Sequence, residues 1–346
     1  MHDILSAVEA LPGSERVLLE VVRNARERRG PHPARTRRIL RRHPELSKLA
    51  GHAPVTGLWM LGYGMLQLGL AAWLGDGPWW LVLLAAYSVG AVLALGIWVL
   101  VHETFHDLVM RRRAGNQLAG ILAALPLTVP SVPIVRTCHV MHHRHQGDAR
   151  LDGDIPSGWE ARLVDNSPLR KAVWLGMGAL VQSSRILRMK GIRLFDRWFV
   201  LAFVLQMTFN CLVVWGLGWP ALAYLLLSNI FSLGLHPLGA RWIQEHFILH
   251  PEQETYSYYG PMNRLCFNAG FHNEHHDLVR VPWMRLPQIR QAAPELYADL
   301  HSYRSWTALL FRFLFDRNLT LECRAIRDGR ANPATAKLAS QTASQK

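Results

Sequence analysis

Cysteine is scarce in this sequence, and the motifs of nucleic-acid binding are missing. The four cysteines, Cys138, Cys211, Cys266 and Cys323, lie far apart and form no CxxC pair. The sequence therefore indicates neither a disulfide framework nor a thiolate metal site. The formal net charge is +13, but no zinc-finger or helix-turn-helix spacing accompanies it. Nucleic acid is therefore not an expected partner.

Lysine and arginine are absent from residues 49–110 and from residues 198–240. Each of these stretches holds two apolar runs separated by a short turn. The runs are Thr56–Leu74 and Trp79–Val101, and then Trp198–Trp215 and Pro220–Leu235. The first two are long enough to cross a hydrocarbon layer of ~30 Å at ~1.5 Å per residue, and the second pair follows the same plan. We therefore expect an all-α integral membrane protein with four transmembrane helices in two hairpins.

The basic residues lie in the segments that border these runs. By the positive-inside rule, both hairpin turns face away from the cytoplasm. We expect a basic amphipathic arm over residues 1–54 that lies on the membrane, a membrane domain over residues 55–327 and a disordered tail over residues 328–346. The middle segment contains two further apolar stretches, at residues 118–135 and 172–187. They are short, and prolines break the first, so we expect surface or re-entrant elements, with a further pair of crossings as the alternative.

Histidines cluster in three short motifs. Box one holds His102 and His106, box two holds His139, His142 and His143, and box three holds His272, His275 and His276. In a helix, the HxxHH spacing of boxes two and three places all three rings on one stripe. The predicted topology puts all three boxes on the cytoplasmic side, just beyond the ends of membrane helices. They can therefore meet in a histidine-rich cap.

Eight imidazoles are too many ligands for one metal ion and suit two. Neutral imidazole binds iron, copper and zinc, and two irons can share the multi-electron reduction of O2. The Glu-x-x-His pairs of soluble di-iron proteins are not seen. We expect the neighbouring carboxylates of Glu103, Asp107, Glu274 and Asp277 to accept hydrogen bonds from the histidine rings and so to orient them. Seven of the histidines outside the boxes are interpreted as ordinary polar residues, namely His2, His32, His43, His52, His145, His250 and His301.

The motifs HETFHD, HVMHHRH and HNEHHD resemble the three histidine boxes of the membrane fatty-acid desaturase superfamily. The chain is most similar to the sphingolipid Δ4-desaturases, or dihydroceramide desaturases, and their C4-hydroxylating relatives. This likeness includes Gly234–Pro237, Glu245-His246, Glu254–Pro261, Asn268–Asp277, Pro31-His32 and Asp154–Pro156. The chain departs from that group after box two, at His145–Gly147, and after box three, at Leu278-Val279.

The resemblance implies that the eight box histidines hold two iron ions, with O2 as co-substrate and electrons from an external carrier such as cytochrome b5 or a ferredoxin with its reductase. It also suggests a ninth ligand, for which His246 is the first choice and His236 the second. A basic run, Arg111–Arg113, can dock an acidic carrier. The implied location is multi-pass in the membrane, with the active site on the cytoplasmic face, in the inner membrane of a bacterium or the endoplasmic reticulum of a eukaryote. Nothing in the sequence indicates an oligomeric state.

The expected activity is the introduction of a Δ4 double bond into a dihydroceramide-like sphingolipid. The alternatives are C4-hydroxylation by the same fold and desaturation of a fatty-acyl chain. Three other classes fit less well. A membrane cytochrome needs its axial histidines inside the spans. A metal transporter or sensor needs ionisable groups there, and the first two spans have none. A non-enzymatic lipid-binding protein gives the boxes no role.

Overall fold

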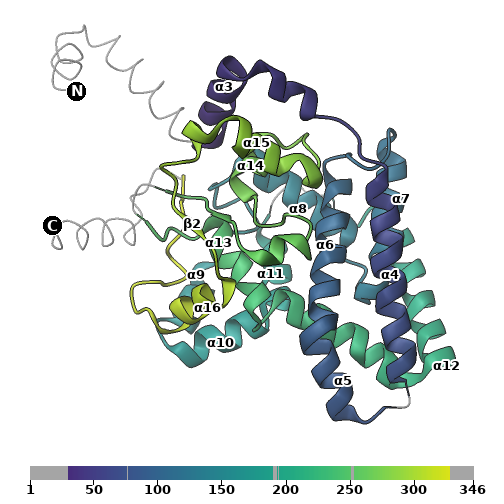
Figure 1. The fold of residues 1–346 in the computed structure, drawn as a ribbon. Coiled ribbons are helices and arrows are strands. Elements are labelled where there is room, and N and C mark those ends of the chain that lie inside the picture. The colour runs from purple at the N-terminus through teal and green to yellow at the C-terminus, as the bar shows by residue number, and fades with distance from the viewer. Residues whose placement is uncertain (1–29, 76, 190–192, 194, 251–252, 328–346) are drawn as a thin grey trace, which may run out of the picture.

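The computed structural model describes residues 30–75, 77–189, 193, 195–250 and 253–327. Within these residues the chain is helical, apart from one parallel pair of short strands, β1 (Ser257–Tyr258) and β2 (Ser302–Tyr303). Long apolar helices form one side of the molecule, and short helices form the other (Figure 1). The expectations for residues 1–29 and for the tail at 328–346 fall outside the described residues.

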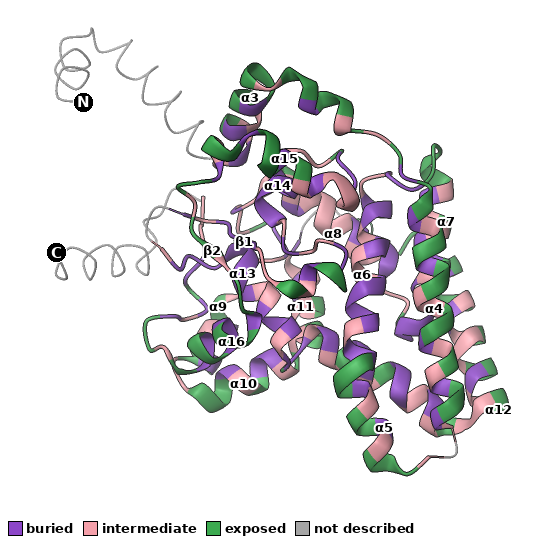
Figure 2. Cartoon of the chain, in the orientation of Figure 1, coloured by how far each residue is buried: buried purple, intermediate pink, exposed green. Residues whose placement is uncertain are grey.

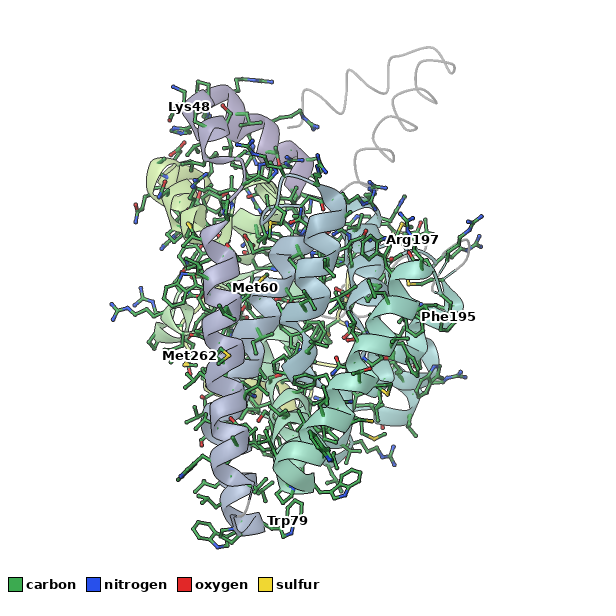
Figure 3. All side chains as sticks on the ribbon, turned by 90° about the vertical axis from the view of Figure 1, so that its right-hand side faces the viewer. Lys48, Met60, Trp79, Phe195, Arg197 and Met262 are labelled. Carbon is green, nitrogen blue, oxygen red and sulfur yellow. The ribbon has the colours of Figure 1, made fainter. Side chains whose placement is uncertain are left out.

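Among the described residues, three helices are long and apolar enough to cross a membrane. The first is α4 (Val55–Leu74). The second runs from Trp79 to Phe105 as α5 (Trp79–Ala85), a π-helical turn η2 (Ala86–Gly90) and α6 (Ala91–Phe105). The third contains α12 (Arg197–Leu233). Apolar side chains cover their outer surfaces (Figure 3), as on Trp80 and Trp215, which are 67 and 87% exposed. Such a surface is stable only against lipid, so this is a membrane protein.

The long helix α12 is interrupted near its middle. Gly218 has a left-handed backbone (φ 82°), and Pro220 follows inside the helix. Gly218 lies in the predicted turn between the third and fourth apolar runs, and Pro220 is the first residue of the fourth run. The interruption lies beside the connection between α4 and α5, since a Cβ added to Gly75 would sit 2.8 Å from the carbonyl oxygen of Leu217.

The apolar helices pack closely around the π-helical turn. A Cβ on Gly90 would lie 2.1 Å from Ser228 Oγ, so only glycine lets α12 approach this closely. The few polar groups in this layer bond to one another. Tyr224 donates to Gln67 Oε1 at 3.1 Å, and the Gln67 amide donates to the Gly90 carbonyl at 3.4 Å. Pairing of this kind is required where no water is available.

The middle segment is divided into short helices, as the prolines predicted. They are α7 (Arg113–Ala123), η3 (Leu125–Leu127), α8 (Val132–His145), α9 (Gly158–Val164), α10 (Pro168–Gly176), α11 (Gly178–Arg185) and η4 (Ile186–Arg188). None of these is among the helices long enough to cross a membrane. The two apolar stretches of this segment therefore form no straight crossings.

The C-terminal third continues with short elements that surround box three. They are η5 (Pro237–Ala240), α13 (Arg241–His246), η6 (Pro261–Arg264), α14 (His272–Asp277), η7 (Trp283–Arg285), α15 (Leu286–Ala292), η8 (Pro294–Leu296) and α16 (Trp306–Phe315). Burial is greatest in α6 and α14, whereas α4 and α5 are largely exposed (Figure 2). The box-three helix is thus at the centre of this half of the molecule.

The N-terminal helix packs on the C-terminal third of the chain. Helix α3 (His32–Arg42) and the turn η1 (Pro44–Leu49) lie over α14 and α15 (Figure 1). Ile39 and Leu46 pack with Val281, Ile289 and Tyr297 in one apolar cluster. The inner face of α3 is therefore covered by protein, and the place of the arm on the membrane stays a prediction.

Candidate metal centre

The histidines of the three boxes sit at or near the ends of helices that converge. Box one occupies the last turn of α6 and the residue after it, where Asp107 turns the chain with a φ of 57°. Box two occupies the end of α8, and box three begins α14. His246 ends α13. The ends of four helices therefore meet at this site.

Five histidine rings form the first cluster. Their nitrogens lie within 4.8 Å of one another, and the members are His102, His106, His139, His143 and His275. His139 is central, because its Nε2 lies 2.8 Å from Nε2 of His102 and 2.9 Å from Nε2 of His106 and His143. The Nε2 atoms of His275 and His143 are 3.1 Å apart. All three boxes contribute to this cluster.

Four more histidines form the second cluster. Nitrogens of His142, His246 and His276 lie within 4.8 Å of one another. The Nε2 of His246 is 2.9 Å from Nε2 of both His142 and His272, so His272 belongs to the same group. The clusters are neighbours, since the rings of His143 and His276 stack with centroids 4.1 Å apart. The structure thus gathers all eight box histidines, and His246 with them.

The donor set fits metal cations. Burial lowers the pKa of His106 to about 3, and burial together with neighbouring imidazoles holds the pKa of His139, His143, His272, His275 and His276 well below the usual value. These rings are neutral at physiological pH, which is the form that binds a metal. The Nε2 of His276 is buried without a hydrogen-bond partner. A buried unpaired nitrogen among other imidazole nitrogens is destabilising unless a cation occupies the centre.

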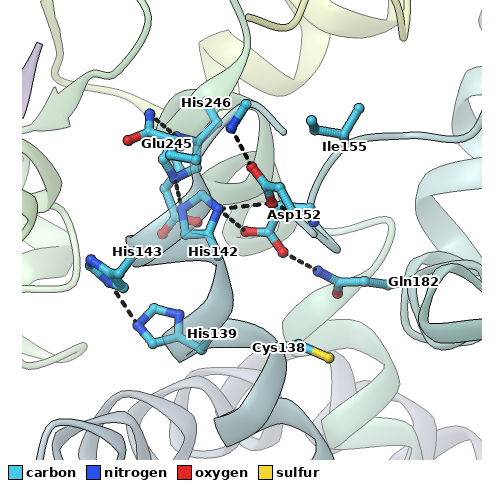
Figure 4. Close-up of polar contacts among 12 residues, drawn as sticks. Cys138, His139, His142, His143, Asp152, Ile155, Gln182, Glu245 and His246 are labelled. Atoms are coloured by element: carbon cyan, nitrogen blue, oxygen red, sulfur yellow. Dashed lines mark hydrogen bonds and ion pairs between the residues drawn. The ribbon is translucent and has the colours of Figure 1, made fainter. Parts of the chain in front are cut away.

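His142 is held differently from the other histidines. Its Nδ1 lies 3.0 Å from Asp152 Oδ1 and 3.6 Å from Asp154 Oδ2 (Figure 4). Burial opposes its protonation, but these two carboxylates outweigh burial and raise the pKa of His142 to about 9. Asp152 also accepts hydrogen bonds from the backbone N–H groups of Gly147 and Asp154. The carboxylate therefore fixes the Nδ1 proton and leaves Nε2 facing the second cluster.

The carboxylates predicted to orient the rings have other partners. Asp107 pairs with Arg136, and Glu274 accepts from Ser257 and Tyr259. Glu103 accepts from the backbone of Trp283, and its nearest oxygen lies 3.9 Å from His102 Nδ1. Asp277 binds residues of α3 and Tyr297. The hydrogen bonds of these four carboxylates thus come from other groups, and their role in orienting the box histidines stays a prediction.

Two single histidines also differ in their surroundings. His236 accepts a hydrogen bond from the backbone of Leu238 and packs edge-on against Tyr87, so it belongs to neither cluster. His32, read as an ordinary polar residue, is buried. Its Nδ1 lies 2.7 Å from Asp277 Oδ1, and its ring centroid lies 4.8 Å from that of His276. His32 is the first residue of the Arg-rich helix α3, and the sequence around it did not predict this long-range contact.

A cavity of about 240 Å³ opens against both clusters. His102, His139 and His275 of the first cluster line it, as do His142, His246 and His272 of the second. Much of the remaining wall is apolar and comes from α6, α8, α11, α12 and the loop before box three. It includes Trp98, Phe105, Val135, Ala179, Ile186, Leu233 and Phe267. Metal ions in the two clusters would thus face an apolar ligand with little water between them.

Comparisons with known proteins agree with this geometry. Residues 78–308 match the family model described as fatty acid desaturase. A sphingolipid delta(4)-desaturase DES1 of Drosophila melanogaster is 38% identical over 289 residues, which cover 83% of this chain and 89% of the relative. A DES1-like protein of Oryza sativa subsp. japonica, also named a sphingolipid delta(4)-desaturase, is 37% identical over 293 residues, or 84% of this chain and 88% of that protein.

A relative with a second activity in its name is nearly as similar. The sphingolipid delta(4)-desaturase/C4-monooxygenase DES2 of Rattus norvegicus is 34% identical over 294 residues, which cover 84% of this chain and 90% of the relative. The family match at residues 78–308 contains the three boxes and every residue that lines the cavity. The chain belongs to the fatty acid desaturase family.

Proposed function

We propose that this oxidoreductase is a di-iron, O2-dependent desaturase that introduces a double bond at the Δ4 position of a saturated sphingolipid chain. One observation carries the proposal: two adjacent histidine clusters form one wall of an apolar cavity. The names of the relatives support a sphingolipid as the substrate. The name of the rat relative supports C4-hydroxylation as the second candidate activity.

The first cluster, His102, His106, His139, His143 and His275, would hold one iron ion. The second, His142, His246, His272 and His276, would hold the other, with His246 as the ninth ligand. When bound, two iron ions supply the redox chemistry that couples reduction of O2 to oxidation of a C–H bond. His142 must lose its Nε2 proton to bind a metal, and the bond to Asp152 keeps the ring in the required tautomer.

The residues that line the cavity would position the lipid chain. Val135, Ala179 and Leu233 line the cavity beside the histidines, and a lipid chain that fills the cavity would exclude water from the reacting carbons. Removal of two neighbouring hydrogens gives a double bond, whereas addition of oxygen after the first gives an alcohol. Both outcomes begin at the same carbon, so small differences in its position decide between them.

The membrane topology completes the proposal. The break at Gly218 and Pro220 would turn α12 into two crossings, which gives four crossings in two hairpins. The histidine clusters would then lie at the cytoplasmic border, in a domain over residues 55–327. An external carrier such as cytochrome b5 or a ferredoxin would supply electrons, and the exposed run Arg111–Arg113 is a candidate contact for its acidic surface.

Lipid mass spectrometry of a host that lacks this activity tests the proposal. Expression of the wild-type chain is expected to produce a sphingolipid lighter by two hydrogen atoms, and a product heavier by one oxygen atom would establish the hydroxylase instead. The variant His275→Ala is the matched control and is expected to form neither. Unchanged sphingolipids, with wild-type protein present in the membrane and loaded with iron, would contradict the proposed substrate.

A further inference from the structure

One part of the cavity wall is polar and is not explained by metal binding. Asp154 follows box two in the loop before α9, and Gln182 lies on α11, a helix that carries no histidine. The Gln182 amide donates to Asp154 Oδ1 at 3.2 Å (Figure 4). Asp154 Oδ2 lies 3.6 Å from His142 Nδ1, so a single imidazole ring separates the pair from the second cluster.

Most other polar side chains on this wall already have partners within the protein. Asn229 accepts from the indole of Trp98 at 2.8 Å and donates to the Leu127 carbonyl at 2.9 Å. Arg241 is paired with Glu245. Asn268 donates to the carbonyl of Trp283 at 3.0 Å. These groups therefore have less capacity left for a ligand.

The Asp154–Gln182 pair retains acceptor capacity. Asp154 accepts one side-chain hydrogen bond, although a carboxylate offers about four lone-pair sites. Among the described residues, the carboxamide oxygen of Gln182 has no hydrogen-bond partner. Acceptors that face a largely apolar cavity are costly unless the occupant donates to them. A ligand with O–H or N–H groups would satisfy both.

We propose that Asp154 and Gln182 bind the polar end of the lipid and thereby determine substrate specificity. Asp154 accepts from the hydroxyl group next to the reacting carbons, and Gln182 Oε1 accepts from the neighbouring amide N–H. This inference rests on the proposed function, since it requires the reacting carbons to lie against the histidine clusters. Only the ring of His142 separates the pair from the second cluster. The polar groups that the pair binds must therefore lie close to the reacting carbon, within one or two bonds of it.

The same geometry discriminates against a plain fatty-acyl chain. A chain without the hydroxyl and the amide would leave both acceptors unpaired when it fills the cavity. Sites built to bind such donors reject analogues that lack them far more strongly than apolar pockets reject a missing methylene. The pair therefore favours an N-acyl amino alcohol over an unsubstituted acyl group.

The test compares two lipids on the full chain in lipid nanodiscs. N-palmitoyl sphinganine carries the hydroxyl and the amide, and its 3-deoxy analogue lacks the hydroxyl. The wild-type protein is expected to bind the first at least about tenfold more tightly. Gln182→Met keeps the length of the side chain but removes the acceptor for the amide N–H, which both lipids carry, so the affinity for both lipids is expected to fall about fivefold or more. Gln288→Met, on the exposed side of α15, is the matched control and should leave both affinities unchanged.

Asp154→Asn is the second variant, and it is expected to lower the preference for the lipid with the hydroxyl, because a neutral amide replaces the charged acceptor of that hydroxyl. Iron content is measured in parallel, because Asp154 is close to His142. Equal binding of the two lipids by the wild type, an unchanged preference in folded Asp154→Asn, or unchanged affinities in folded Gln182→Met would overturn the inference. Failure of the proposed function is a separate result: the wild type would bind the lipids with the expected preference but convert neither.

Discussion

At the scale of single residues, the histidines of the site are not equivalent. Burial among other imidazoles keeps most of them neutral, and the pKa of His106 falls to about 3. His142 instead faces two carboxylates, which raise its pKa to about 9. Protons would therefore compete with a metal ion mainly at His142, in the second cluster.

Acidification is expected to release metal from the second cluster first. Below about pH 9 the free His142 carries an extra proton that metal binding must displace, so metal affinity there should fall about tenfold per pH unit. In the first cluster, the pKa values of His106, His139, His143 and His275 are all lowered, so these rings carry no proton that a metal must displace. Titration of apo protein with Co²⁺ between about pH 6 and 8, followed by visible absorption, measures both affinities.

Asp152→Asn provides the control for this pH dependence. Without that carboxylate the pKa of His142 should fall, so the pH dependence of the weaker site should be reduced. Equal pH dependence at the two sites of the wild type would show that His142 does not control metal binding.

His246→Ala is expected to halve the iron content. The ring lies 2.9 Å from both His142 and His272, and its loss removes one of four donors from the second cluster. Elemental analysis should give about one iron per chain where the wild type has about two, with the first cluster intact. His236→Ala should retain the wild-type content, because His236 lies in neither cluster. Similar losses in the two variants would contradict the ligand assignment.

At the scale of elements, α3 is joined to the box-three helix by a buried charge network. Asp277 is bonded to His32, Arg35 and Tyr297, and its side chain is fully buried. Burial alone would raise the pKa of Asp277, but His32 and Arg35 outweigh it and hold that pKa below its usual value. An ionised carboxylate at the base of α14 thus depends on residues about 240 positions earlier in the chain.

Removal of one partner from this network should destabilise the protein strongly. Arg35→Ala leaves the buried carboxylate without its guanidinium, and such losses typically cost about 3–5 kcal/mol. Thermal unfolding of the purified protein measures the change. Arg38→Ala removes an exposed arginine from the same helix and is expected to have little effect. If the two variants unfold alike, α3 does not stabilise box three through this pair.

The contact between the π-helical turn and α12 is also testable. Gly90→Ala would place a Cβ 2.1 Å from Ser228 Oγ and 3.0 Å from the Tyr224 ring, so α12 must shift. We expect a loss of about 1–3 kcal/mol, as for an overpacked core, measured as a lower unfolding temperature in detergent. Gly62→Ala on α4 meets no atom within 4 Å and should be neutral or stabilising. A neutral Gly90→Ala would refute the close packing.

At the scale of the whole molecule, the sequence predicted the membrane helices and the gathering of the three boxes. The runs without charge and the histidine spacing are local patterns, and they indicate which residues lie in long apolar helices and which histidines share one face of a helix. The partners of Asp277 and the place of His32 were not predictable in this way. The contact between His32 and Asp277 joins residues 245 positions apart, and the pattern of residues within one helix cannot predict such a contact. The same holds for Asp152, which meets His142 only because the loop after α8 turns back.

The four-crossing topology predicts opposite accessibility for two sets of positions. Cysteines introduced at Gly77 and Gly216, which lie at the predicted turns, should react with a membrane-impermeant thiol reagent only from the non-cytoplasmic side. A cysteine at Ser305, before α16, should react only from the cytoplasm. The labelling is done in a variant without the four native cysteines. Reaction of Gly216→Cys from the cytoplasmic side would mean that α12 does not turn back at Gly218.

One feature of α6 bears on how the reacting carbon is selected. This helix is the second part of a membrane-spanning segment and ends in box one. The first cluster would therefore be held at a fixed depth relative to the bilayer. With a lipid held by its head, a longer tail would extend only toward the bilayer midplane. The oxidised carbon, counted from the head, would stay the same for tails of different length. The position of the oxidised carbon would therefore be set by its distance from the membrane–water interface.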